Sequence, residues 1–217
     1  MAAGTREKIV ETALRVFNEQ GFGNVSLADL AGEAGIAKGN LWYHFNDKRA
    51  LLEALNKAYI ERIEYRRTIW PEAGRELEGF AHLLRTIADE IRDFRFMFRD
   101  QASYGEHSPA LEAALAKIYS DVMAQFRAFY EAMRAAGLLN LSDEELDPLV
   151  FNTTIGLRFH LEFLRELGRD SGPKAGAVRS ALLQCFSLFE ARLSEEARSD
   201  LKDLLLTDAQ SDQQAAG

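Results

Sequence analysis

The stretch GIAKGNLWYHFNDK, residues 35–48, decides how the N-terminal part of the chain folds. A glycine opens it, and three aromatic side chains and a histidine follow between two lysines. Leu41 and Phe45 are four residues apart, so they share the inward face of a short helix expected at about 37–45. The polar and aromatic residues between them then face outward, where a protein core cannot use them. The stretch therefore predicts a helix whose outer surface is built to touch another molecule.

Two further helices are expected before this one. Thr5 can cap a first helix that runs to about Gln20. Ser26 and Asp29 have the spacing of a capping box, which predicts a second helix that Gly35 ends. The residues expected on the inward faces of these two helices are Ile9, Val10, Ala13, Leu14, Phe17, Leu27, Leu30 and Ala31. Because only a tight turn separates the second helix from the third, the pattern indicates a helix-turn-helix arrangement.

The rest of the chain also reads as helical. It is rich in the good helix formers Ala, Leu, Glu and Arg, and its 217 residues include only 4 prolines. Further helices are expected at residues 47–70, 75–92, 94–98, 109–136, 143–167, 173–193 and 194–206. The predicted fold is therefore all-α, with a helix-turn-helix domain at 1–47, a larger helical domain at 48–206 and a disordered tail at 207–217.

The charge of the chain is distributed unevenly. The formal net charge is −8, which taken alone disfavours nucleic acid as a partner. Residues 1–50, however, hold six Lys or Arg and six Asp or Glu, so the whole acidic excess lies in the remainder. A neutral head can meet DNA if its acidic body is held away from it. The single cysteine, Cys185, and a charged N-terminal stretch with no long apolar run predict a cytoplasmic protein without a disulfide, signal peptide or membrane span.

The outer face of the third helix carries groups suited to DNA. Lys38 offers a charge to a phosphate, and Gly39 allows the helix to approach a groove closely. Asn40 can both donate to and accept from a base edge, for which adenine has the best geometry. The other residues expected to reach phosphates or bases, through polar ring groups or helix N-termini, are Ser26, Trp42, Tyr43, His44 and Lys48. The alternative is a small helical subdomain with a solvated polar face.

Residues 5–55 resemble the DNA-binding head of the TetR family of bacterial transcription regulators. The resemblance rests on the stretch KIVETALRVFNEQGFGNVSLADLAGEAGIAKGNLWYHFNDKRALL, and GNLWYHF is similar to a branch of the family that carries GNLYYHF. It implies a phosphate contact at Ser26 and another at Lys48. It also implies that Ala37 to Asn40 form the N-terminal part of a recognition helix, and that Trp42, Tyr43 and His44 are its aromatic contacts.

Two residues depart from the family pattern. Ala37 stands where the family often has Ser or Thr, so a helix cap and a phosphate contact are missing. Trp42 replaces the usual Tyr, and its indole can donate one hydrogen bond but cannot accept one.

The resemblance also implies a two-fold dimer through the last two long helices, at 143–167 and 173–193. Their apolar surface is broad for one internal face, although packing within one chain is the alternative. On the first helix the residues concerned are Leu149, Val150, Thr153, Gly156, Leu157, His160, Leu161 and Leu164. On the second they are Val178, Ala181, Leu182, Cys185, Phe186, Phe189 and Leu193.

A small-molecule pocket is expected among the body helices, because apolar cavities with a few polar groups make such sites. Its aromatic and apolar candidates are Trp70, Phe94, Phe98, Tyr104, Met123, Phe126, Tyr130, Phe159 and Phe163. Its polar candidates are Arg99, Asn152, Thr154, Arg158 and His160. The ligand is expected to be apolar or amphipathic, with Arg99 or Arg158 facing an acid group. The alternative for each aromatic residue is an ordinary place in the core.

These features together predict a homodimeric repressor that binds double-stranded DNA at a palindromic operator and is released by a small-molecule effector. The helix at 47–70 joins head to body and is the expected lever. The alternative is a helical enzyme or carrier that uses the body cavity. The acidic run DEIRD at 89–93 could hold Mg²⁺ for a diphosphate, but a solvated helix face is the favoured interpretation. The histidines lack metal-binding spacings, so no metal, cofactor or catalytic residue is expected.

Overall fold

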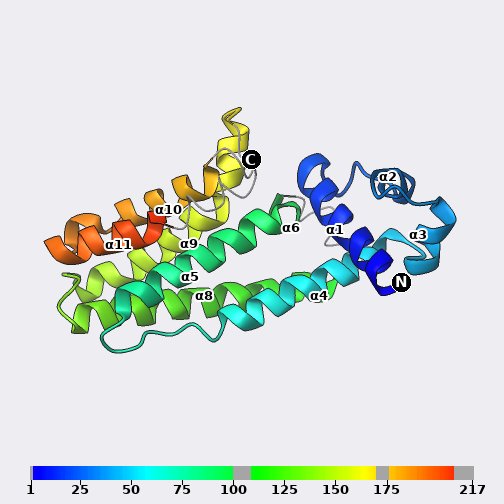
Figure 1. Ribbon diagram of the computed structural model, residues 1–217. Coiled ribbons are helices and arrows are strands. Elements are labelled where there is room, and N and C mark those ends of the chain that lie inside the picture. The colour runs from blue at the N-terminus through cyan, green and yellow to red at the C-terminus, as the bar shows by residue number, and fades with distance from the viewer. Residues whose placement is uncertain (1, 100–108, 170–175, 208–217) are drawn as a thin grey trace. The chain divides into compact units, whose positions relative to one another are not determined.

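The computed structural model describes residues 2–99, 109–169 and 176–207, and the regular elements in these ranges are helices (Figure 1). They are α1 (Ala2–Gln20), α2 (Leu27–Glu33), α3 (Lys38–His44), α4 (Lys48–Arg66), α5 (Glu76–Asp93), α6 (Arg95–Arg99), α8 (Pro109–Ala135), α9 (Asp143–Glu166), α10 (Ala177–Ser187), a 3-10 helix (Glu190–Arg192) and α11 (Glu195–Thr207). The all-α expectation is confirmed. None of these helices is both long enough and apolar enough to cross a lipid bilayer.

Several helices begin where the sequence carries a capping signal. At α2 the Asp29 N–H donates to Ser26 Oγ over 3.2 Å, and the Ser26 N–H donates to Asp29 Oδ2 over 2.9 Å. Ser142 and Glu145 form the same reciprocal box at α9. The Asp47 carboxylate accepts a backbone N–H at the start of α4. These bonds satisfy donors that every helix start leaves without a partner inside the helix.

Two helix ends differ from the expectation. The first helix begins at Ala2, so Thr5 lies inside it and does not cap it. The fourth ends at Arg66, before the expected end at Trp70, and the carbonyls of Arg66 and Ile69 accept hydrogen bonds from the Gln125 amide of α8.

The C-terminal region also differs in detail. The helix expected at 173–193 is the shorter α10, followed by the 3-10 helix. Pro173, expected to open it, lies outside the described residues, as does the expected tail beyond Thr207.

Packing divides the chain into two compact units. The first comprises Met1–Glu64 and Asp93–Leu115, and the second comprises Tyr65–Arg92 and Ala116–Gly217. The helix-turn-helix therefore belongs to a unit larger than residues 1–47, since most of α4 and all of α6 pack with it. Helix α4 is continuous from the first unit into the first residues of the second.

The first unit is organised around Phe17 of α1, which is fully buried. Its ring centroid lies 5.1 Å from that of Phe22 and 5.4 Å from that of Phe96 in α6. Next to it, the Asn18 amide donates to the Asp93 carbonyl over 2.7 Å and accepts the Phe96 N–H over 3.0 Å. Aromatic packing and one amide thus attach α6 to α1.

The second unit has an aromatic core. The ring of Phe80 in α5 lies 5.2 Å from Tyr130 in α8 and 5.8 Å from Phe189, centroid to centroid. The buried Tyr130 hydroxyl lies 2.7 Å from the Thr153 hydroxyl of α9, so its polar atom is satisfied. This core holds α5, α8 and α9 together and so determines which side chains of these helices face outward.

Candidate nucleic-acid interface

The turn between α2 and α3 is tightly defined. Gly35 has a φ of 64°, a left-handed conformation that costs a glycine little. Its N–H donates to the Gly32 carbonyl over 3.0 Å, and the Ile36 N–H donates to the Ala31 carbonyl over 3.0 Å. These bonds close the end of α2 and direct the chain into α3. The predicted helix-turn-helix is therefore present.

Helix α3 has the two faces that the sequence predicts. Leu41 and the following Phe45 are buried in the head. On the other side the Tyr43 side chain is 82% exposed and Trp42 is 54% exposed. The remaining residues that lie on this outer face, all of them exposed, are Ala37, Lys38, Gly39 and Asn40. Two large aromatic rings exposed to water on one short helix leave apolar surface uncovered, which indicates that this face binds a partner.

Gly39 supports the same interpretation. A Cβ added at this position would meet nothing within 4 Å, and the backbone there is ordinary helix. Glycine inside a helix costs roughly 1 kcal/mol relative to alanine. Nothing in the fold of the head requires that cost, whereas a close external surface would.

The remaining predicted contacts lie around this face. His44 is half-buried, with its ring edge-on to that of Tyr43 at 5.3 Å between centroids. Ser26 is exposed, and its hydroxyl donates to the Asp29 carboxylate. This hydrogen bond is the main reason that the pKa of the Asp29 carboxyl lies below its usual range. Ala37 begins α3 without a side-chain cap, as the sequence implies.

Lys48 has a different environment from Lys38. It is half-buried, its ammonium donates to the Phe22 carbonyl, and it lies 4.2 Å from the centroid of the Phe22 ring. Lys48 therefore takes part in the packing of the head, besides standing at the N-terminus of α4.

The predicted ligand residues that the structure describes are distributed over both units. Phe94 and Phe98 lie against Tyr59 in the first unit, with ring centroids 5.1 and 5.9 Å away. Phe126 and Tyr130 are fully buried in the core of the second unit. Tyr104 and the side chain of Arg99 lie outside the described residues.

The other candidates lie near the surface of the second unit. Trp70 is exposed, with its indole N–H donating to the Arg67 carbonyl over 2.9 Å. The Arg158 Nε donates to the Tyr119 hydroxyl over 2.8 Å. A groove of about 450 Å³ between α9 and α10 is lined by Asn152, Phe159, His160 and Phe163, among others. The remaining polar candidate, Thr154, donates to the Val150 carbonyl of its own helix.

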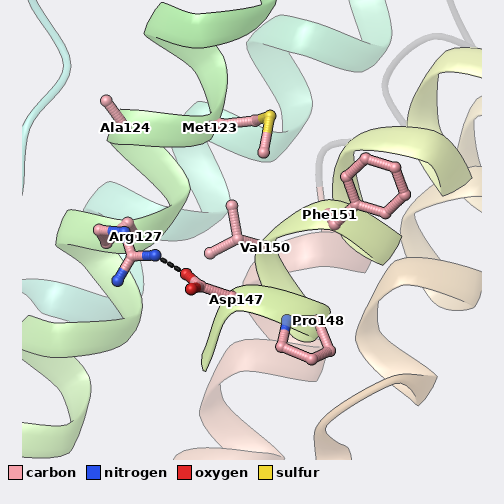
Figure 2. Close-up of a pocket in the computed structure, with 7 residues that line it drawn as sticks. All are labelled: Met123, Ala124, Arg127, Asp147, Pro148, Val150 and Phe151. Atoms are coloured by element: carbon pink, nitrogen blue, oxygen red, sulfur yellow. Dashed lines mark ion pairs between the residues drawn. The ribbon is translucent and has the colours of Figure 1, made fainter. Parts of the chain in front are cut away.

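A hollow of about 690 Å³ opens between α8 and α9 (Figure 2). Its wall is apolar except for one ion pair, in which Arg127 of α8 meets Asp147 of α9. The residues that line it are Met123, Ala124, Arg127, Asp147, Pro148, Val150 and Phe151. Only Met123 was expected from the sequence, because nothing in the spacing of the other residues pairs a position on α8 with one on α9.

An apolar stripe runs along the outer face of α9. Its members recur every four residues and are each at least 40% exposed, and they are Phe151, Ile155, Phe159, Phe163 and Leu167. Most of the residues expected at a dimer surface instead pack inside the chain, including Leu157, Leu161 and Phe186. A Cβ on Gly156 would lie 3.6 Å from Cys185 Sγ, so Gly156 serves the contact between α9 and α10. The α9 residues expected at the dimer surface thus lie mostly on its inward face, which is apolar as well.

The carboxylates of the acidic run at 89–93 form ion pairs with arginines. Glu90 is buried against Arg66, and Asp93 lies 3.2 Å from Arg62. Its solvated-face interpretation is therefore wrong for Glu90. Within the described ranges no cluster of three or more His, Cys, Asp or Glu side chains could hold a metal ion.

The chain matches two protein-family models. The TetR model, described as "Bacterial transcriptional repressor", matches residues 42–201. A second model, "Bacterial regulatory proteins, tetR family", matches residues 9–55. The first alone spans well over half of the chain.

Individual relatives match mainly at the head. The chain is 43% identical to the HTH-type transcriptional regulator TtgR of Pseudomonas putida over 54 residues, 25% of this chain and 26% of that protein. It is 33% identical to the tetracycline repressor protein class D of Escherichia coli over 102 residues, 47% of this chain and 44% of that one. The matches thus span less than half the length of these relatives.

Solved structures resemble the whole chain. A TetR-family transcriptional regulator from Marinobacter aquaeolei VT8 superposes with a TM-score of 0.74 over 95% of this chain and 98% of that one, at 20% identity. A gamma-butyrolactone receptor (ArpA like protein) superposes with a TM-score of 0.63 over 97% and 98%, at 16% identity. At these identities the likeness concerns the fold alone.

Proposed function

The chain belongs to the TetR family of bacterial transcriptional repressors, and from this we propose that it is a homodimeric repressor that binds a palindromic operator and is released by a small apolar or amphipathic effector. One observation carries the DNA-binding part: the outer face of α3 exposes Lys38, Asn40, Trp42 and Tyr43 around a glycine that the fold does not require. A helix in a major groove would use each of these. Chromosomal DNA as partner implies a cytoplasmic location, and the GNLWYHF form suggests the GNLYYHF branch.

The test is footprinting on the DNA upstream of the protein's own gene, followed by gel-shift titration. We expect a protected site with two-fold symmetry. The double variant Lys38→Ala with Tyr43→Ala should lose binding while it keeps the helical circular dichroism of the native protein. Lys202→Ala with Tyr65→Ala changes the same residue types at exposed positions on α11 and α4 and should bind normally. Equal binding by both variants would refute the interface on α3.

The dimer is proposed to form along the exposed α9 stripe. A repeat of large apolar side chains along a helix is the pattern that a two-fold axis can cover with a copy of itself. A single head reads too few base pairs for specificity, so pairing two heads gives the stripe a functional reason.

The effector is proposed to bind in the hollow between α8 and α9. Met123, Val150 and Phe151 offer an apolar wall, and the Arg127–Asp147 pair offers a charged end (Figure 2). Because Asp147 is largely exposed, an acid group on the effector could replace it at Arg127 at small cost in desolvation.

The anionic apolar fluorophore anilinonaphthalene sulfonate is a suitable probe of this hollow. We expect its fluorescence to rise with the native protein and to fall by several-fold with Arg127→Gln. Arg134→Gln, which removes a guanidinium elsewhere on α8, should leave the signal unchanged. Equal signals from both variants would exclude the hollow as the site of the probe.

Release from DNA is proposed to follow from linkage. We propose that the effector prefers a body conformation in which the two heads are wrongly spaced for the operator, so that it lowers the affinity for DNA. By linkage, bound DNA lowers the affinity for the effector by the same factor. Helix α4 carries the chain without a break from the first unit into the second, so it is the proposed lever. The matched relatives are regulators, so the helical enzyme or carrier is not favoured.

A further inference from the structure

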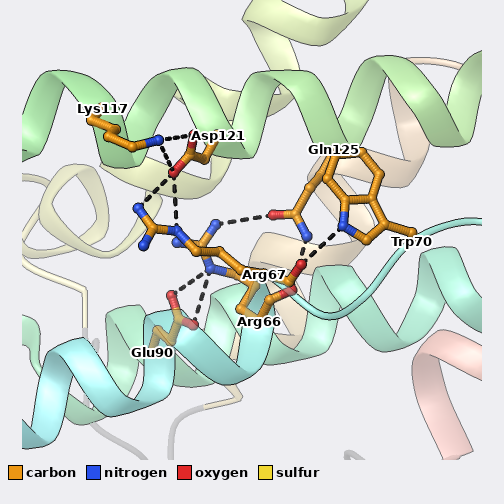
Figure 3. Close-up of polar contacts among 7 residues, drawn as sticks. All are labelled: Arg66, Arg67, Trp70, Glu90, Lys117, Asp121 and Gln125. Carbon is orange, nitrogen blue, oxygen red and sulfur yellow. Dashed lines mark hydrogen bonds and ion pairs between the residues drawn. The ribbon is translucent and has the colours of Figure 1, made fainter.

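The last turn of α4 ends in a buried polar cluster (Figure 3). The Arg66 side chain is 1% exposed, and its Nε donates to the Glu90 carboxylate of α5 over 3.1 Å. The Gln125 amide of α8 donates to the carbonyls of Arg66 and Ile69, over 2.8 Å in each case. Its oxygen lies 3.4 Å from an Arg66 Nη. We call Arg66, Glu90 and Gln125 the anchor cluster.

Stability alone is a weak reason for this cluster. Moving a guanidinium and a carboxylate out of water is costly, and a pair of apolar side chains of similar size often serves a core as well. A buried ion pair does differ from apolar packing in one respect: it defines a single arrangement, because any slip leaves charged groups without partners. The cluster is therefore suited to fixing the position of a helix.

A second layer holds the same turn from outside. The Arg67 guanidinium donates to Asp121 of α8, over 2.6 Å at its shortest, and Lys117 donates to the same carboxylate over 2.9 Å. The hydrogen bond from Lys117 first, and then the bond and charge of Arg67, hold the pKa of Asp121 below its usual range. Asp121 and, one turn further along, Gln125 are thus the two α8 side chains that contact the end of α4, and Lys117 supports Asp121 from the preceding turn.

The same stretch of α8 carries both the anchor and the hollow. Gln125 faces the end of α4, whereas its neighbours Ala124 and Arg127 line the hollow toward α9 (Figures 2 and 3). Because an α-helix is rigid over one turn, a displacement of α8 at the hollow also moves Gln125.

We propose that the anchor cluster positions α4, and that through α4 it sets the separation of the two α3 helices in the dimer. Arg66, Glu90 and Gln125 are positioning residues, since none of them lies on the DNA-binding face. Occupation of the hollow would act by moving Gln125 against the end of α4. This inference rests on the proposed function, because it concerns the spacing of two DNA-binding heads.

The experiment is a binding selection from a DNA library in which two copies of the footprinted half-site are separated by spacers of every length. Native protein should enrich one spacing. Gln125→Leu, and separately Arg66→Met with Glu90→Met, should accept neighbouring spacings with a loss of about tenfold in preference, in the range of measured couplings between distant sites. Affinity for a single half-site should be unchanged. Arg134→Met with Asp143→Leu removes an ion pair elsewhere in the same unit and should keep the native preference.

The outcomes separate the two proposals. If native protein binds no DNA, the proposed function fails, and the anchor proposal fails with it. If native protein selects one spacing and the folded anchor variants select it as sharply, the anchor proposal alone is overturned. Circular dichroism establishes folding, and should the double variant not fold, Gln125→Leu decides the question.

Discussion

Gly79 of α5 lies so close to Phe129 of α8 that a Cβ on the glycine would be 2.9 Å from the phenyl Cε1. Phe129 is fully buried, with its ring centroid 5.7 Å from that of Phe80, so a shift of its ring would disturb the core. Gly79 therefore sets how closely α5 and α8 approach, and these are the two helices that hold the end of α4.

Gly79→Ala is expected to destabilise the protein. The added methyl would overpack the core at a cost of about 1–3 kcal/mol, which exceeds the gain of about 1 kcal/mol in helix propensity. The melting temperature, measured by circular dichroism, should fall by a few degrees. An unchanged or higher melting temperature would mean that Phe129 can move aside.

Gly39→Ala should have the opposite effect on stability. A Cβ there meets nothing, so the helix propensity of alanine should stabilise the head by up to about 1 kcal/mol. DNA affinity should nevertheless fall, because the methyl stands where α3 is proposed to approach the groove. Thermal melts and gel shifts on the same preparation measure both effects. Full affinity in a stabilised variant would show that Gly39 is not at the interface.

Lys38 and Lys48 were both expected to contact phosphates, and their environments predict different losses. Lys38→Ala should leave stability unchanged and should lower the slope of log affinity against log salt by about 0.9, the value for one phosphate contact. Lys48→Ala should also reduce the free energy of unfolding by about 1–2 kcal/mol, because its ammonium bonds to the Phe22 carbonyl and lies over the Phe22 ring. Salt titrations and chemical denaturation separate the two. Equal stability of both variants would contradict the packing role of Lys48.

The helices of the head could be predicted from sequence because their signals are local. The Ser26–Asp29 box and the spacing of Leu41 and Phe45 each act within one turn, and the structure has both. The outer face of α3 followed directly, since what does not face inward on so short a helix must face out.

The body was less predictable because its contacts join distant residues. Both faces of α9 are apolar, so periodicity alone could not tell Leu157, which is buried, from Phe159, which is exposed. The partner of Glu90 is Arg66 on another helix, and no local pattern connects the two. The Arg127–Asp147 pair was missed for the same reason.

Tyr130 predicts a loss of stability in alkali. Burial raises the pKa of its hydroxyl, so the folded protein holds this proton more tightly than the unfolded chain does. The contribution of this proton to the free energy of unfolding is complete below the tyrosine pKa of the unfolded chain, about 10. Above that pH it is lost by up to about 1.4 kcal/mol per pH unit. Burial also raises the pKa of the adjacent Cys185 to about 12, which adds a loss of the same sign.

The variant Tyr130→Phe isolates the tyrosine, because Cys185 and the surface lysines are common to both proteins. We expect the variant to be about 1 kcal/mol less stable at neutral pH, since Thr153 loses its partner, and to lose less stability in alkali. Urea denaturation at several pH values measures this. Parallel pH profiles of the two proteins would contradict a buried neutral Tyr130.

Phe159→Glu tests the dimer at the centre of the α9 stripe. Phe159 is 53% exposed and the Arg158 guanidinium lies 4.7 Å from its ring centroid, so a glutamate there can stay in water beside a positive charge and should not unfold one chain. Facing its own copy across a two-fold axis, however, the carboxylate would be buried against a second one, which costs several kcal/mol. Analytical ultracentrifugation should therefore show monomers, and operator affinity should fall because each head then binds alone. Tyr65→Glu, on an equally exposed aromatic residue of α4, should leave the dimer intact. A Phe159→Glu protein that remained dimeric would place the contact between copies away from the stripe, and the repeat of four along α9 would need another partner.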